Sequence, residues 1–191
     1  MRHGLPRERL LALADARVPE AFGDAPPDMQ ALKSSYETAE GALFELAVLI
    51  LGAGSGAAER AARHAGLAYG LTKTLCTIPV QASQKKLLLP PSYFESRGVS
   101  LAAVYSGKTS AEFAAALAGL REMADRALQQ FIAAAPELSP AAWPAFLPLS
   151  LVKPYLKAMA APSLDPLQTV ATLNPALQFW RIWRAALRRR I

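Results

Sequence analysis

Residues 42–51 restrict the fold of this chain more than any other segment, because they would be apolar on nearly every face of a helix, with Glu45 the exception. They end a longer helical stretch, 32–51, whose first turns are polar. Asp28 precedes it as a candidate N-cap, and the glycine-rich run 52–56 ends it. A helix that is apolar all round lies in the interior of a helical protein. We therefore expect a central helix surrounded by other helices.

The remainder of the chain also has a helical pattern. Alanine and leucine dominate, apolar residues recur at spacings of three and four, and no segment alternates as a strand does. The fold class predicted from the sequence is all-α. Further helices are expected at 7–18 (stopped by Pro19), 57–76 (stopped by Pro79), Thr109 or Ser110 to 134, 151–159 and 176–190, with a connection over 77–91 and a short helical turn at 91–94.

Composition excludes several classes of protein. Of the 191 residues, 52% are hydrophobic and 19% are charged, which is unlike a disordered chain. The longest apolar stretch, 46–54, is far shorter than the roughly 20 residues that a membrane span needs. Residues 1–10 become charged before any apolar core, unlike a secretion signal. Cys76 is the single cysteine, so we expect a reducing compartment, the cytoplasm.

Positive charge is concentrated in the last part of the chain. Residues 166–191 contain five arginines and no acidic residue, whereas the other sixteen basic residues are balanced by fifteen acidic ones. A nucleic-acid-binding face would need basic residues spread over the body, so no nucleic acid partner is expected.

The terminal helix 176–190 carries aromatic residues together with arginines. On one side we expect Phe179, Trp180, Ile182, Trp183 and Leu187, and on another Arg181, Arg184 and Arg188. This composition is typical of a helix lying on an anionic membrane, with Trp180, Trp183, Arg184 and Arg188 as the contact residues. The alternative is that the tryptophans dock on the body while the arginines face solvent.

Few residues could carry catalysis. The two histidines are His3 and His64. Cys76 is expected to be a packing residue near a helix C-terminus. Glu37 and Glu40 look like ordinary charges near the start of a helix. No glycine-rich phosphate loop follows a strand, and no Cys/His cluster has metal spacing. We therefore predict no catalytic residue.

Two short segments carry a resemblance to a known family. Residues 70–77 read GLTKTLCT and residues 85–90 read KKLLLP, and together they resemble the second aspartate signature of the squalene/phytoene synthase family. The resemblance implies an isoprenoid-synthase-type helical bundle. In the synthases, two aspartates one turn apart hold Mg²⁺ ions that bridge a prenyl diphosphate.

The sequence departs from that signature at the residues that matter for metal binding. Thr77 and Gln81 stand at the two aspartate positions, Lys73 replaces an asparagine, and Leu88 replaces a tyrosine. Pro79 is expected to distort the helix that would align the pair. We therefore expect no cofactor, with Mg²⁺ needed only if the protein is a transferase after all.

Three longer segments resemble a narrower branch. Residues 2–32, 144–159 and 178–190 are similar to α-proteobacterial squalene/phytoene synthase-like proteins, which are related to the mitochondrial complex I assembly factor of the same fold. In that branch the segment like 2–32 lies well inside the chain. We therefore expect 1–175 to be the C-terminal portion of such a domain, incomplete at its N-terminus, and 176–191 to be a basic amphipathic terminal helix. A protein partner or the missing N-terminal half would cover the apolar surface left exposed.

The resemblance implies a non-catalytic protein acting in the assembly or maturation of a membrane complex, respiratory complex I, from the cytoplasm and peripherally on the inner membrane. One alternative is a prenyl-diphosphate-condensing transferase whose aspartate motifs are missing or supplied by a partner, and another is a module that binds an isoprenoid or lipid ligand. For these alternatives the candidate residues are an anion or diphosphate patch of Lys73, Lys85 and Lys86, and a cavity lining of Tyr69, Tyr93 and Phe94. The lysines could equally be surface residues and the aromatics core residues.

Overall fold

The computed structural model describes residues 5–191, except for the side chains of 19–21, and every regular element in this part of the chain is a helix. The all-α prediction is therefore confirmed. The α-helices are α1 (Arg7–Phe22), α2 (Met29–Ile50), α3 (Gly56–Cys76), α4 (Ile78–Ser83), α5 (Pro91–Glu95), α6 (Leu101–Tyr105), α7 (Ala111–Ala134), α8 (Trp143–Phe146), α9 (Val152–Met159) and α10 (Pro175–Arg188). Three short 3₁₀ turns lie between α7 and α9: η1 (Ala135–Glu137), η2 (Pro140–Ala142) and η3 (Leu147–Leu151).

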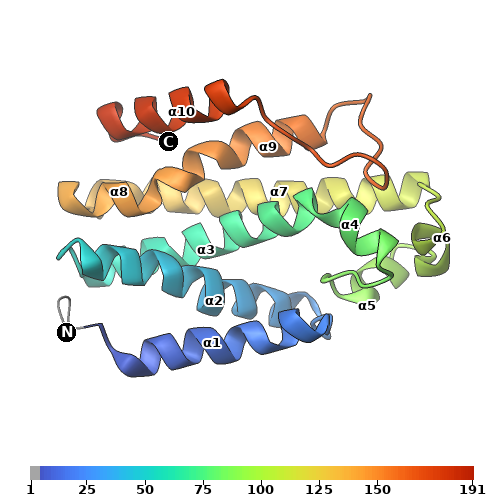
Figure 1. The fold of residues 1–191 in the computed structure, drawn as a ribbon, viewed down its shortest axis with the longest axis horizontal. Coiled ribbons are helices and arrows are strands. Elements are labelled where there is room, and N and C mark those ends of the chain that lie inside the picture. The colour runs from blue at the N-terminus through green and yellow to red at the C-terminus, as the bar shows by residue number, and fades with distance from the viewer. Residues whose placement is uncertain (1–4) are drawn as a thin grey trace.

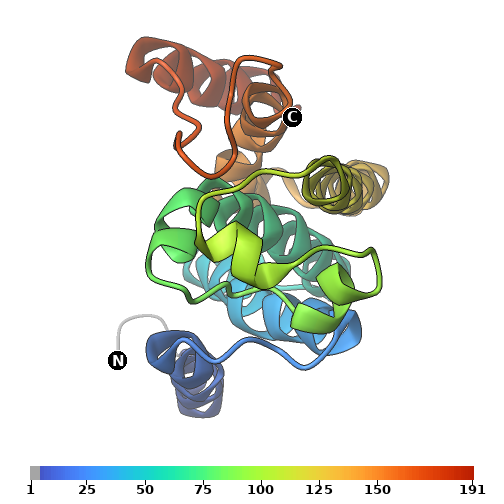
Figure 2. The ribbon, with the colours of Figure 1, turned by 90° about the vertical axis from the view of Figure 1, so that its right-hand side faces the viewer.

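The long helices are stacked with their axes in roughly similar directions, and Figure 1 shows α1 at one edge of the stack and α10 at the other. Figure 2, which looks along the helices, shows the same order: α1, then α2 and α3, then α7, then α9 and α10. The short helices α4, α5 and α6 close one end. Both α1 and α10 therefore have one side that no other described helix covers.

The core lies where α3 packs between α2 and α7. Helix α3 presents small residues on its buried sides, including Ala61, Ala65 and Ala68, which lets its neighbours approach closely. The predicted amphipathic pattern of α7 is confirmed, since its expected apolar positions are buried: Phe113, Leu117, Leu120, Ala124, Leu128 and Phe131.

Side-chain caps fix the starts of the three longest helices. The Asp28 carboxylate accepts a hydrogen bond from the backbone N of Ala31 at 2.8 Å, as predicted. The hydroxyl of Ser55 caps α3. The hydroxyl of Ser110, and not that of Thr109, caps α7. Each cap satisfies a backbone donor that the first helical turn leaves without a partner.

Two prolines act differently from what the sequence suggested. Helix α1 continues through Pro19 to Phe22, because a proline near the end of a helix removes one backbone hydrogen bond without forcing the helix to stop. Helix α3 does end at Cys76, as expected, but the connection expected after it starts with a new helix that contains Pro79. This proline occupies the second position of α4, where the missing N–H has no helical partner to lose, so a new helix begins directly after Thr77.

Ion pairs link helix α1 to the body. None of its described side chains is buried. Arg9 pairs with Glu45 on α2 and, at 3.1 Å, with Glu59 on α3. Four of its large apolar side chains are instead exposed, whereas Leu13 is half-buried: the exposed ones are Leu10, Leu11, Val18 and Phe22.

Within residues 5–191, none of the helices has the length and apolar character needed to cross a membrane.

Candidate functional site

The side chain of Gln81 organises the region that resembles the second aspartate signature. Gln81 is buried on α4, and its Nε2 donates to the carbonyl of Thr74 at 3.0 Å and to the Thr77 hydroxyl at 2.7 Å. Its Oε1 accepts from the backbone N of Leu88 at 2.8 Å. One carboxamide thus joins the end of α3, the start of α4 and the connection that follows. The helical path is interrupted at Thr77, between α3 and α4, but the expected distortion by Pro79 does not keep Thr77 and Gln81 out of contact.

This arrangement does not fit a magnesium ion. Mg²⁺ prefers hard, preferably anionic oxygen ligands. Here the two candidate ligands are a neutral hydroxyl and a neutral amide, and the amide oxygen already accepts a backbone hydrogen bond. In the described part of the chain, no three His, Cys, Asp or Glu side chains lie close enough together to hold a metal.

A buried carboxylate that the sequence pattern did not single out lies beside this region. Glu40 of α2 is 2% exposed, and its Oε1 lies 2.7 Å from Nζ of Lys73 on α3 and 3.0 Å from Nη2 of Arg17 on α1. Glu40 is therefore not an ordinary charge near a helix start, as the sequence suggested. Its position could have been found from spacing, because Tyr36 and Phe44, four residues to either side, also face the interior.

The three lysines of the candidate anion patch have different surroundings. Lys73 is bound to Glu40. The Nζ of Lys86 donates to the carbonyl of Phe22 at 3.3 Å and so links the connection after α4 to the end of α1. Lys85 is exposed and has a left-handed backbone (φ 55°). Two of the three ammonium groups therefore bind protein acceptors instead of pointing together at one anion.

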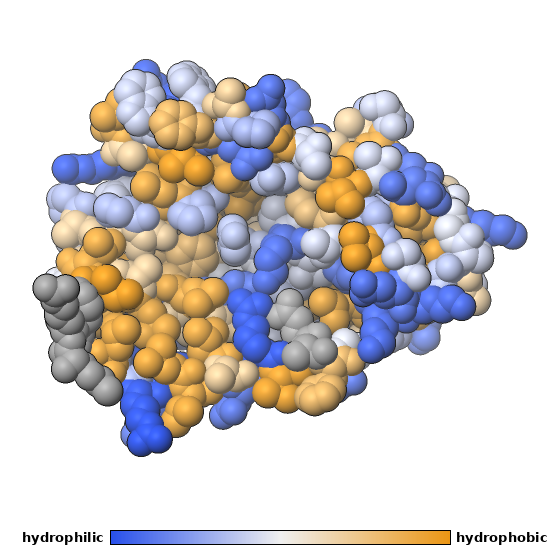
Figure 3. Space-filling view, viewed as in Figure 1, coloured by the Kyte–Doolittle hydropathy of each residue, from blue (hydrophilic) through white to orange (hydrophobic). Residues whose placement is uncertain are grey.

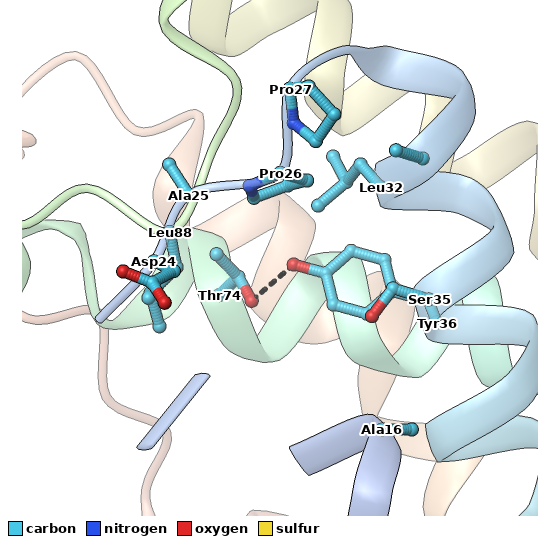
Figure 4. Close-up of a pocket in the computed structure, with 11 residues that line it drawn as sticks. Ala16, Asp24, Ala25, Pro26, Pro27, Leu32, Ser35, Tyr36, Thr74 and Leu88 are labelled. Carbon is cyan, nitrogen blue, oxygen red and sulfur yellow. Dashed lines mark hydrogen bonds between the residues drawn. The ribbon is translucent and has the colours of Figure 1, made fainter. Parts of the chain in front are cut away.

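A cavity of about 280 Å³ opens between α2, the end of α3 and the connection from α1 to α2 (Figure 4). The Tyr36 hydroxyl donates to Oγ1 of Thr74 across its floor at 2.6 Å. Leu32 and Leu88 supply apolar walls, and the Asp24 carboxylate lies at the side. The cavity is partly apolar and adjoins the Gln81 network through Thr74 and Leu88.

The aromatic residues proposed as cavity lining are placed elsewhere. Phe94 is fully buried and packs at 5.7 Å from Phe113. Tyr93 is buried beside it, and its hydroxyl donates to the carbonyl of Ala116 at 2.9 Å. Tyr69 is half-buried with its ring edge-on to Phe44 at 5.9 Å. None of the three borders the cavity in Figure 4, and all three contact the hydrophobic core.

Cys76 packs at the end of α3. Its Sγ lies 3.8 Å from Sδ of Met159 on α9, and burial raises the pKa of the Cys76 thiol to about 11. A thiol with that pKa is a poor nucleophile near neutral pH. Of the two histidines, His64 is half-buried on α3, and His3 lies outside the described residues.

The candidate membrane residues all lie exposed on α10: Trp180, Trp183, Arg184 and Arg188. One neighbour was assigned wrongly. Ile182 was expected on the same side as the tryptophans, but it is half-buried, on the side of α10 that packs against η3. The apolar residues of α10 therefore divide between a covered side and an open side.

Comparison with known proteins gives three similarities. Residues 1–189 match the squalene/phytoene synthase family. The chain is 25% identical over 187 residues to a mouse (Mus musculus) protein, NADH dehydrogenase (ubiquinone) complex I, assembly factor 6. The aligned region covers 94% of this chain and 56% of the mouse protein. The fold is similar to that of squalene synthase HpnC from Alicyclobacillus acidocaldarius, with a TM-score of 0.65 and 14% identity, covering 81% of this chain and 57% of that one. The chain thus spans little more than half the length of either protein.

Proposed function

Because the chain belongs to the squalene/phytoene synthase family, we propose that it is a non-catalytic member that acts in the assembly or maturation of a membrane complex, respiratory complex I. In this proposal the protein works from the cytoplasm and reaches the inner membrane peripherally. The complex is suggested by the mouse relative, whose name describes a complex I assembly factor.

The observation that carries the non-catalytic part is the use made of Gln81. Gln81 stands where the family resemblance places a metal-binding aspartate. Its amide nitrogen donates to Thr74 and Thr77, and its amide oxygen accepts from Leu88. A side chain engaged in this way stabilises the junction of α3 and α4 and is not available to neutralise a diphosphate. This supports a structural role at the former reaction centre.

A role through protein contacts is supported by α1. Its outward side carries Leu10, Leu11, Val18 and Phe22, and the Phe22 side chain is 70% exposed. Figure 3 shows a wide apolar area over the part of the molecule where α1 and α2 lie. Extended exposed apolar surface of this kind is typical of a protein-binding face.

The two other candidate functions have less support. A transferase would need carboxylates from another chain or segment to hold the metal. A lipid- or isoprenoid-binding module would need a roomy apolar cavity, and the cavity beside Tyr36, at about 280 Å³, is slightly smaller than the roughly 300–1,000 Å³ usual for ligand pockets.

Two measurements made together test the proposal. The first is the amount of assembled complex I, by native gel electrophoresis and NADH:quinone oxidoreductase activity, in membranes of cells lacking the gene and of the same cells carrying it again. We expect loss in the first and recovery in the second. The second is Mg²⁺-dependent diphosphate release by the purified protein from farnesyl or geranylgeranyl diphosphate, and here we expect none.

Each measurement can contradict the proposal separately. Normal complex I in the deletion cells would remove the assembly role. Diphosphate release would restore the transferase, with its carboxylates supplied from outside the Gln81 region. Binding of the prenyl diphosphate without release, together with normal complex I, would favour the lipid-binding module.

A further inference from the structure

Helix α10 presents its apolar aromatic residues away from the protein. Ala185 is the one buried side chain of α10, on the side that packs against η3. Phe179, Trp183 and Leu187, spaced four residues apart, form a stripe on the other side, and they are 72%, 52% and 66% exposed. A terminal helix that docks on its own body has the opposite arrangement, with its large apolar side chains inside. The outer stripe therefore belongs against something other than the body of this chain.

A row of arginines runs along one flank of this stripe. Arg181, Arg184 and Arg188 border a cavity of about 530 Å³ between α10 and η3, which Ser150 and Arg190 also line. Across the described residues, no carboxylate lies within ion-pair distance of these arginines. The cavity therefore concentrates positive charge, and within residues 5–191 none of these three arginines is held in an ion pair.

Arg181 has a buried hydrogen-bond donor that lacks an acceptor. It lies half-buried on the side of α10 nearer the body, and its Nε is buried with no hydrogen-bond partner in the part of the chain that the structure describes. Unpartnered buried donors are rare, because each costs free energy. A guanidinium row of this kind suits a phosphate group, which accepts two parallel N–H hydrogen bonds from arginine.

The apolar stripe and the arginine row together indicate a partner that is both anionic and apolar. Residues 166–191 have no acidic residue, while the rest of the chain is nearly neutral, so α10 is the part of the molecule attracted to an anionic surface. In Figure 3 strongly hydrophilic groups lie beside apolar ones along the edge where Figure 1 places α10. Figures 1 and 2 show that edge at the outside of the stack, open to a flat surface. Tryptophan and phenylalanine beside arginine are the residues of a helix lying at a membrane interface.

We infer that α10 binds an anionic phospholipid surface, with the stripe of Phe179, Trp183 and Leu187 entering the acyl boundary and the exposed Arg184 and Arg188 beside it holding lipid phosphates. Trp180 lies between the two groups, and its ring is 5.2 Å from the Arg184 guanidinium, so it joins the apolar side to the charged side. The inference does not depend on the complex I assignment.

The test is co-sedimentation of the full chain with phosphatidylcholine vesicles that contain or lack phosphatidylglycerol. We expect binding that requires the anionic lipid and weakens as salt rises. The Arg184→Gln, Arg188→Gln double variant should bind about thirtyfold more weakly, since each basic residue near such a surface contributes about a fivefold factor. The matched control is Arg60→Gln, Arg126→Gln, which removes the same charge from exposed positions on α3 and α7 and should bind almost as the wild type does.

A second measurement follows the stripe directly. With Trp143 and Trp180 both changed to Phe, Trp183 is the single tryptophan of the chain, and brominated lipid should quench its fluorescence when anionic vesicles are present. Equal binding to neutral vesicles, an unchanged affinity in the Arg184/Arg188 variant, or no quenching of Trp183 would each overturn the inference. Self-association in solution without vesicle binding would overturn it as well and assign the stripe to a second copy. Inorganic phosphate bound in the absence of any vesicle binding would reassign the arginine row to a free anion.

Discussion

Gly66 of α3 lies directly against the backbone of Gly41 on α2. A Cβ added at Gly66 would stand 2.4 Å from the backbone N of Gly41, 2.7 Å from its Cα and 2.7 Å from the carbonyl oxygen of Tyr36. These are backbone atoms, so no side-chain rotation could relieve the overlap. The close packing of α2 against α3 at this point depends on the absence of a side chain at Gly66.

Gly66→Ala should therefore push α2 and α3 apart. Overpacking a core usually costs about 1–3 kcal/mol, and contact with fixed backbone places this variant at about 3 kcal/mol or more. Urea denaturation followed by far-ultraviolet circular dichroism measures the loss. Gly56→Ala is the matched control at the start of the same helix, where the nearest atom to an added Cβ is Nη1 of Arg60 at 3.8 Å. A midpoint for Gly66→Ala equal to that of the control would show that the helices do not meet as described.

The Gln81 network gives a second prediction. Gln81→Glu keeps the size of the side chain and the acceptor for Leu88, but a carboxylate cannot donate to Thr74 or Thr77. Losing both donated hydrogen bonds and burying a charge at this position should cost about 1–3 kcal/mol near neutral pH. The deficit should shrink in acid, because the protonated carboxyl regains one donor. Gln84→Glu, an exposed change at the residue directly after α4, should leave stability within about 0.5 kcal/mol at either pH.

Glu40 offers a third prediction, on the attachment of α1. Glu40→Gln removes the buried charge that Lys73 and Arg17 share. Both cations are about one-third exposed and can turn to water, so the cost should be about 1–3 kcal/mol, less than for a fully buried pair. Glu122→Gln breaks an exposed pair with Arg126 on α7 and should cost about 0.5 kcal/mol or less.

Limited proteolysis distinguishes the Glu40 contact from a general loss of stability. Helix α1 has no buried described side chain, so weakening the Arg17 contact should expose the connection around 23–28 to protease before the core opens. Cleavage there at the wild-type rate in Glu40→Gln would contradict the view that this ion pair holds α1.

Local sequence patterns predicted most of the fold because the physics there is local. The spacing of apolar residues in α7 is carried by the helix itself, and the caps at Asp28 and Ser110 act within three residues. The error at Pro79 arose from treating proline as a helix stop without asking which position of a new helix it would occupy. The position, not the residue type, decides the effect.

The candidate site was harder to predict because its contacts join distant segments. Spacing within α2 indicates that Glu40 faces the interior, but no pattern within a single helix predicts that Lys73 and Arg17, on two other helices, reach it. The sequence left two orientations of α10 open, since both bury one side of an amphipathic helix. Only the placement of Ala185 against η3 shows that Trp183 faces outward.

The last prediction concerns the reactivity of Cys76. Burial raises the pKa of its thiol to about 11, so at about pH 8 roughly one molecule in a thousand carries the thiolate, compared with about a quarter for an ordinary cysteine of pKa about 8.5. Alkylation by iodoacetamide should therefore be slow near neutrality and should keep accelerating as pH rises, about tenfold for each unit below the pKa. The matched control is Cys76→Ala, Ser34→Cys, which places a thiol at an exposed position on α2, and its alkylation rate should level off about 2.5 pH units lower. Equal rates for the two proteins would show that Cys76 is not shielded at the end of α3 by Met159 and its neighbours, and the site would then have a usable nucleophile after all.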